Sequence, residues 1–191
     1  MKRHHLLLGL LSAWMPALAG AHPGHDTLNF IHGLQHPWMG LDHLAAMIAV
    51  GMWAAQMGGK QRWWAPLSFV GVMLLGGALG RVGMQVGWVE QGIAASVLVL
   101  GLLVAFAVRL PLFASLSLVG CFALLHGYAH GAEAPANANL LSYFTGFGLS
   151  TLVLHGVGLL FALWGVRDAK VGGLRWVGAA VAVYGAVLCV S

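Results

Sequence analysis

Charged residues are scarce in this sequence. They make up 7% of the chain, with only five acids, whereas 60% of the residues are hydrophobic. Soluble globular domains carry about 25% charged residues, so this chain has too few charges to cover a surface that faces water. Its nine basic residues are scattered between apolar runs and form no patch that would bind a nucleic acid. A lipid bilayer is therefore the predicted surrounding of most of the protein.

Cysteine is also scarce, and common catalytic motifs are absent. The two cysteines, Cys121 and Cys189, lie in apolar runs and give neither a disulfide framework nor a Cys-x-x-Cys metal motif. No nucleotide-binding motif occurs, and no His-Glu-x-x-His motif of a zinc protease. We therefore expect no enzyme of these classes and no use of ATP.

The first 21 residues have the three parts of a secretory signal peptide. Lys2 and Arg3 precede an apolar run that ends at Leu18, and three small residues follow, ending at Ala21. Cleavage there would leave His22 as the first residue of the mature chain, on the far side of the membrane from the ribosome. An uncleaved signal anchor is the alternative. The predicted organisation is a signal peptide at 1–21 and a single transmembrane domain at 22–191.

Six apolar runs of near-spanning length follow a polar, histidine-rich stretch that ends at Gln35. They are residues 37–57, 66–86, 91–108, 111–131, 140–164 and 172–190. The predicted fold class is therefore all-α, with six transmembrane helices. Two small-xxx-small pairs, Gly76 with Gly80 and Gly127 with Gly131, predict close packing between helices.

The basic residues predict the orientation of these helices. If the mature chain starts outside, only Arg81 falls on the outer side. The residues on the cytoplasmic side are then Lys60, Arg62, Arg109, Arg167, Lys170 and Arg175. This bias obeys the positive-inside rule, and both ends of the mature chain would lie outside.

Histidines and acids gather at the outer side of this topology. Apart from His4 and His5 in the signal peptide, only His155 and Asp168 lie elsewhere. The outer set is His22, His25, Asp26, His32, His36, Asp42, His43, Glu90, His126, His130 and Glu133. Asp42 and His43 are predicted to lie inside the outer leaflet, where an ionisable side chain is costly and therefore indicates function.

Two helices carry the central residues of this set. Asp42 and His43 lie within two turns of the helix start predicted at His36–Pro37, and they project about 100° apart. One would therefore bind a metal while the other orients a second imidazole. In the fourth helix, the i, i+4, i+7 spacing places a further group on one stripe, namely His126, His130 and Glu133. Imidazole and carboxylate ligands suit zinc, nickel, cobalt, copper and iron, and spacing alone does not select among them.

Other polar residues each admit two interpretations. Residues 22–26, with His22, His25 and Asp26, form either a capture arm for metal or a disordered polar terminus. Glu90 either completes the outer site or is a solvated loop acid. His155 is either a step in the inner half of a transport route or a packed structural histidine.

Two segments resemble signatures of the HupE/UreJ family. Residues 36–43, His-Pro-Trp-Met-Gly-Leu-Asp-His, are similar to its first-helix signature. Residues 126–133, His-Gly-Tyr-Ala-His-Gly-Ala-Glu, are similar to its fourth-helix signature, although Leu125 stands where a phenylalanine often precedes it. The signal peptide, the His-Pro-Gly-His start and the six-helix layout extend the resemblance over essentially the whole chain.

The resemblance implies a permease of the bacterial inner membrane that carries nickel, or cobalt in some members, without a prosthetic group. It implies association with hydrogenase or urease supply, and hence with their accessory proteins. It assigns to the metal route His36, Asp42, His43, His130 and Glu133, and it adds Phe69 and Glu90. Two alternatives use the same histidines without transport: a membrane metalloenzyme or haem protein, and a metal sensor or storage protein.

Overall fold

The computed structural model describes residues 25–83, 86–167 and 171–191. Their secondary structure is entirely helical, which confirms the all-α prediction for this part of the chain. The elements are α2 (His25–Gln35), the 3₁₀ helix η1 (His36–Trp38), α3 (Leu41–Met57), α4 (Gln61–Arg81), α5 (Val89–Ala105), α6 (Leu112–Glu133), α7 (Leu140–Arg167) and α8 (Val171–Val190). The predicted signal peptide at 1–21 lies outside the described residues, as do His22, Asp168 and Lys170.

Length and apolar composition make this chain a multi-pass membrane protein. Helices α4, α6, α7 and α8 are each long and apolar enough to cross a bilayer. Helices α2 and α3 meet the same criteria only together, as one span bent by 80°, and α5 is shorter, with 17 residues. Between four and five helical spans are thus supported among the described residues, and the count of six stays a prediction.

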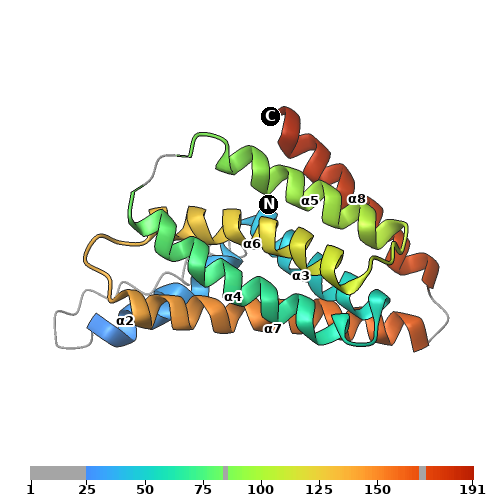
Figure 1. Ribbon diagram of the computed structural model, residues 1–191, viewed down its shortest axis with the longest axis horizontal. Helices are drawn as coiled ribbons and strands as arrows, with labels where there is room; N and C mark the ends of the chain where they lie inside the picture. The colour runs from blue at the N-terminus through green and yellow to red at the C-terminus, as the bar shows by residue number, and fades with distance from the viewer. Residues whose placement is uncertain (1–24, 84–85, 168–170) are drawn as a thin grey trace, which may run out of the picture.

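The polar stretch before the first predicted span is itself a helix, which the sequence pattern did not indicate. Helix α2 lies beside the first half of α7 in Figure 1, and glycines make this approach possible. A Cβ atom at Gly33 would overlap the backbone of Tyr143, and one at Gly146 would overlap the backbone of Phe30. The chain then turns through η1, where Pro37 is buried, into α3. His36 therefore lies at the sharp bend between α2 and α3.

Close backbone contact also joins α4 to α6. These helices lie side by side in Figure 1, and both predicted small-xxx-small pairs are at their interface. A Cβ at Gly76 or Gly80 would overlap the backbone of α6, and one at Gly127 or Gly131 would overlap that of α4. Since backbones in such contact leave no room for side chains, α4 and α6 pack as a rigid pair. Helices α5 and α8 form a second close pair.

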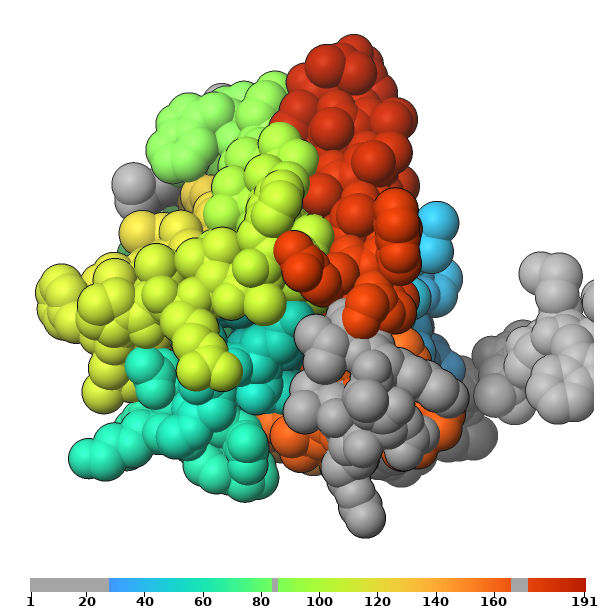
Figure 2. All heavy atoms as spheres, turned by 90° about the vertical axis from the view of Figure 1, so that its right-hand side faces the viewer, coloured from blue at the N-terminus to red at the C-terminus, as the bar shows by residue number. Residues whose placement is uncertain are grey.

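Basic residues gather at one end of the helical bundle. Lys60 and Arg62 lie at the start of α4, Arg109 lies between α5 and α6, and Arg175 lies in the first turns of α8. Figure 2 shows this end, where the α3–α4 and α5–α6 connections come near the beginning of α8. Arg81 ends α4 at the opposite end. This separation is the one expected for a cytoplasmic and an outer face.

Candidate metal-binding site

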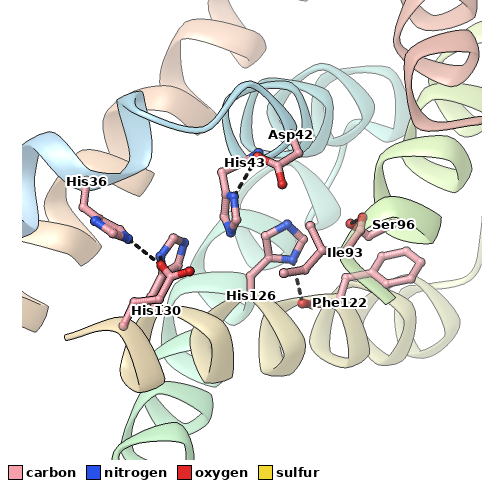
Figure 3. Close-up of polar contacts among 9 residues, drawn as sticks. His36, Asp42, His43, Ile93, Ser96, Phe122, His126 and His130 are labelled. Carbon is pink, nitrogen blue, oxygen red and sulfur yellow. Dashed lines mark hydrogen bonds and ion pairs between the residues drawn. The ribbon is translucent and has the colours of Figure 1, made fainter. Parts of the chain in front are cut away.

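Four imidazole rings from three elements lie in a row near the end of the bundle where α4 and α6 end. His36 comes from η1, His43 from the first turn of α3, and His126 and His130 from the last turns of α6 (Figure 3). The ring centroids of His36 and His130 are 4.6 Å apart, and those of His130 and His43 are 4.2 Å apart. The row continues from His43 to His126 at 4.9 Å. Rings this close can pass one ion between them or share it.

His36, His130 and Glu133 have the spacing of a metal-ligand set. His36 Nε2 lies 3.1 Å from Glu133 Oε2, and His130 Nδ1 lies 3.7 Å from the same oxygen. One ligand atom from each residue lies within 4.8 Å of the other two. Bonds of about 2.0–2.2 Å to a first-row metal place neighbouring donor atoms roughly 3–3.5 Å apart. Only a small contraction of this group would therefore enclose an ion. The bound ion would then replace the direct contact between His36 and Glu133.

Asp42 holds the ring of the adjacent His43. The Asp42 carboxylate accepts a hydrogen bond from the backbone N–H of His43 at 2.8 Å and another from its Nδ1 at 3.0 Å. We expected Asp42 or His43 to orient a second imidazole, whereas the imidazole that Asp42 orients is that of His43 itself. Because Nδ1 donates to the carboxylate, Nε2 keeps its lone pair and is available as a ligand.

His126 is oriented in the same way by the backbone. Its Nδ1 donates a hydrogen bond to the carbonyl oxygen of Phe122 at 2.9 Å, so its Nε2 also keeps a lone pair. His126 and His130 are buried, with 0% and 2% of their surfaces exposed. The Nε2 atoms of His43 and His126 and both ring nitrogens of His130 are buried without a hydrogen-bond partner. Such unpaired polar atoms are destabilising, and a bound metal ion would satisfy them.

A cavity of about 280 Å³ opens beside this row of rings. Three carboxylates line it, those of Asp42, Glu90 and Glu133, together with His36, Met39, Gly40, His43 and His130. No lysine or arginine is among these lining residues, so the cavity carries negative charge that attracts cations. Glu90 is exposed, in the first turn of α5, and has no contact at hydrogen-bond distance to the histidines among those the structure shows.

The structure thus brings together the six residues that sequence analysis placed at the centre of the site. They are His36, Asp42, His43, His126, His130 and Glu133. Glu90 lies at the rim of the same cavity, and Phe69 contacts His126 at a ring-centroid distance of 5.7 Å. His155 lies beyond Phe69, away from the cavity. His25 and Asp26 are in the first turn of α2, but their side chains are outside the described part of the chain.

Two aromatic residues of the site were not predicted. Phe147 packs edge-on against His130 with ring centroids 4.3 Å apart, and Tyr143 contacts His36 at 6.0 Å. Both are buried in α7. Their i, i+4 spacing places them on one face of the helix, but this pattern alone does not separate a wall of a site from ordinary core packing.

Two comparisons with known proteins cover all or nearly all of the chain. The family described as HupE / UreJ protein matches residues 9–188. Protein HupE from Rhizobium leguminosarum bv. viciae is 43% identical over 193 residues, which covers 100% of both chains. No solved structure matches the chain.

Proposed function

This chain belongs to the HupE/UreJ family, and from that membership we propose that it carries nickel ions, or cobalt ions, across the bacterial inner membrane into the cytoplasm. The family consists of permeases rather than enzymes. The observation that carries the proposal is the group His36, His130 and Glu133, whose ligand atoms lie within 4.8 Å of one another at the edge of a negatively charged cavity. Imidazole with carboxylate is a donor set that suits both ions.

Transport would begin in the cavity that Asp42, Glu90 and Glu133 line. The carboxylates concentrate cations there, and the imidazoles of His36 and His130 replace part of the hydration shell. The ion then moves along the row of rings toward His43 and His126, whose Nε2 atoms are free to bind it. Each imidazole that binds the ion must offer it the lone pair of an unprotonated ring nitrogen.

The membrane potential supplies enough energy for this movement. One elementary charge moving across 100 mV is worth about 2.3 kcal/mol, so an ion of charge +2 gains about 4.6 kcal/mol when the inside is negative. Uptake therefore requires no ATP, in keeping with the lack of a nucleotide-binding motif. Inside the cell, nickel would pass to the accessory proteins of hydrogenase or urease, with the mature N-terminus of the permease in the periplasm.

Accumulation of radioactive nickel tests the proposal directly. Cells that express the wild-type chain should accumulate ⁶³Ni²⁺, and the His43→Ala and His130→Ala variants should accumulate far less at equal expression. His32→Ala is the matched control, because His32 is an exposed histidine of α2. Equal accumulation by wild type and both site variants would overturn the proposal. Competition with Co²⁺ and Zn²⁺ in the same assay determines which ion is preferred.

A second measurement separates transport from binding alone. If the purified protein binds nickel through these histidines but proteoliposomes that contain it take up none, the chain is a metal sensor or storage protein. A visible absorption band in the purified protein would instead indicate haem.

A further inference from the structure

His155 is an ionisable residue in the apolar interior of the bundle. It lies in α7, is 1% exposed, and neither of its ring nitrogens has a hydrogen-bond partner. A neutral imidazole always carries one N–H donor and one lone pair, so both are left unsatisfied at this position. An apolar side chain of similar size would be more stable there, which makes a purely structural role an inadequate account of His155.

The ring of Phe69 contacts both His155 and one of the outer histidines, His126. Phe69, from α4, is fully buried. Its centroid is 5.7 Å from that of His126 and 5.1 Å from that of His155, with an edge-on angle of 82° to the latter. The row of rings that starts at His36 therefore continues inward, with one apolar ring inserted before its last imidazole.

The depth of His155 in the bundle distinguishes it from the other ligand-type residues. In a helix of 28 residues, it lies about 22 Å from Leu140 and about 18 Å from Arg167 along the axis. Among the side chains that the structure describes, every other histidine, aspartate and glutamate is in α2 or η1, or within about two turns of the outer end of α3, α5 or α6. His155 is thus the described residue of this kind nearest the middle of the helical bundle.

We propose that His155 is an inner metal-binding residue of this permease and that the Phe69 ring separates it from the outer site. This inference rests on the transport function proposed above. An ion that leaves His126 has no other described imidazole or carboxylate to bind as it moves inward. His155 would meet it there with a lone pair that no protein group occupies. A single imidazole binds the ion weakly, which suits a transit site, because a permeating ion must both enter and leave.

In its present position, Phe69 closes the proposed route of the ion from His126 to His155. Its ring presents an apolar surface to both His126 and His155, and in the proposed route it must turn or shift before an ion can pass. Loading of the outer site and transfer to His155 are therefore separate steps, and substitutions at His155 should affect only the second.

The test measures two properties of the same purified, full-length protein. One is equilibrium binding of Ni²⁺ in detergent, and the other is uptake of ⁶³Ni²⁺ into proteoliposomes with an inside-negative potential. His155→Leu removes the ligand and keeps the volume, whereas His155→Met replaces imidazole by a weaker sulfur ligand. Leu159→Met is the matched control, since Leu159 is a buried residue of the same helix.

We expect His155→Leu to bind nickel like wild type and to melt at the same or a higher temperature. Its uptake of ⁶³Ni²⁺ should be at least about tenfold slower, as for the loss of other metal-site groups. His155→Met should recover part of the uptake, and Leu159→Met should match wild type. The inference fails if His155→Leu transports normally, if its binding and Tm fall along with uptake, or if His155→Met is as inactive as His155→Leu. If wild type itself takes up no nickel, the proposed function fails instead, so the two failures are distinguishable.

Discussion

The side chains of Asp42 and His43 act as one unit, although adjacent residues of a helix project about 100° apart. The carboxylate accepts hydrogen bonds from both the backbone N–H and the ring Nδ1 of His43, at 2.8 and 3.0 Å. In Figure 3 the ring of His43 points from α3 toward His126 and His130. A carboxylate that fixes the tautomer and direction of a metal-binding imidazole raises its strength as a ligand. The role of Asp42 is therefore to position His43 and to add charge at the cavity.

We expect Asp42→Asn to weaken nickel binding about 10- to 100-fold, the usual cost of removing a group that orients a ligand. The amide keeps the size of the side chain and can still accept the backbone N–H of His43. It lacks the charge that favours a ring with Nδ1 protonated and Nε2 free. Calorimetric titration of the purified variant with Ni²⁺ measures the change, and His32→Ala serves as the control. An unchanged affinity would show that His43 needs no carboxylate.

Substitutions of His36 and Glu133 should have non-additive effects on the affinity for Ni²⁺. Their side chains meet at 3.1 Å although they are 97 residues apart in the chain. If both bind one ion, the double variant His36→Ala with Glu133→Gln will lose less affinity than the sum of the two single losses. The measured quantity is the Kd for Ni²⁺ of each member of the cycle.

A matched cycle gives the control for this prediction. His32→Ala combined with Glu133→Gln should be additive, because His32 is an exposed residue outside the group His36, His130 and Glu133. Additive losses in the His36 cycle as well would mean that His36 and Glu133 do not share an ion.

Part of this arrangement can be predicted from the sequence and part cannot. The apolar runs indicate the helices, and the i, i+4, i+7 spacing places His126, His130 and Glu133 on one face of α6. Periodicity does not say which helices are neighbours, so the contact between His36 and Glu133 is visible only in three dimensions. The bond from Asp42 to His43 was missed because projection around a helix ignores a short side chain that folds back onto the next residue.

Helix α2 was missed for a different physical reason. Residues 25–35 include charged and polar side chains, and their composition resembles a loop rather than a membrane helix. Their helical structure is stabilised by packing on α7, where Gly33 and Gly146 allow the two backbones to touch. Tertiary contact of this kind overrides local propensity and leaves little trace in a single sequence.

The rigid pairing of α4 and α6 predicts opposite effects for two glycine substitutions in α6. A Cβ at Gly127 would overlap the backbone of Met73, so Gly127→Ala should push the helices apart and lower the Tm. A Cβ at Gly120 would meet only the Cγ2 of Val72, at 3.9 Å. Gly120→Ala should therefore be neutral or stabilise the protein by about 0.5–1 kcal/mol, because alanine favours a helix over glycine. Thermal unfolding in detergent compares the two, and equal Tm values would contradict the close contact.

Glu90 should assist capture of the ion without binding it tightly. It lines the same cavity as Asp42 and Glu133 but is exposed at the start of α5. A charge in this position acts through its field, which raises the local concentration of cations. We therefore expect Glu90→Gln to raise the KM for ⁶³Ni²⁺ uptake into proteoliposomes and to leave the maximal rate unchanged, with Glu90→Asp close to wild type.

Ionic strength separates this role from direct ligation. The screening length falls from about 30 Å at 0.01 M salt to about 3 Å at 1 M, so an effect that acts through the field should be large at low salt and disappear at high salt. A direct ligand would behave differently, because its bond to the ion is too short to be screened. If Glu90→Gln lowers the maximal rate equally at both salt concentrations, Glu90 binds the ion during transport. The first ligand set would then extend from η1 and α6 to α5, and Glu90 would have to move toward His36 and Glu133 as the ion enters.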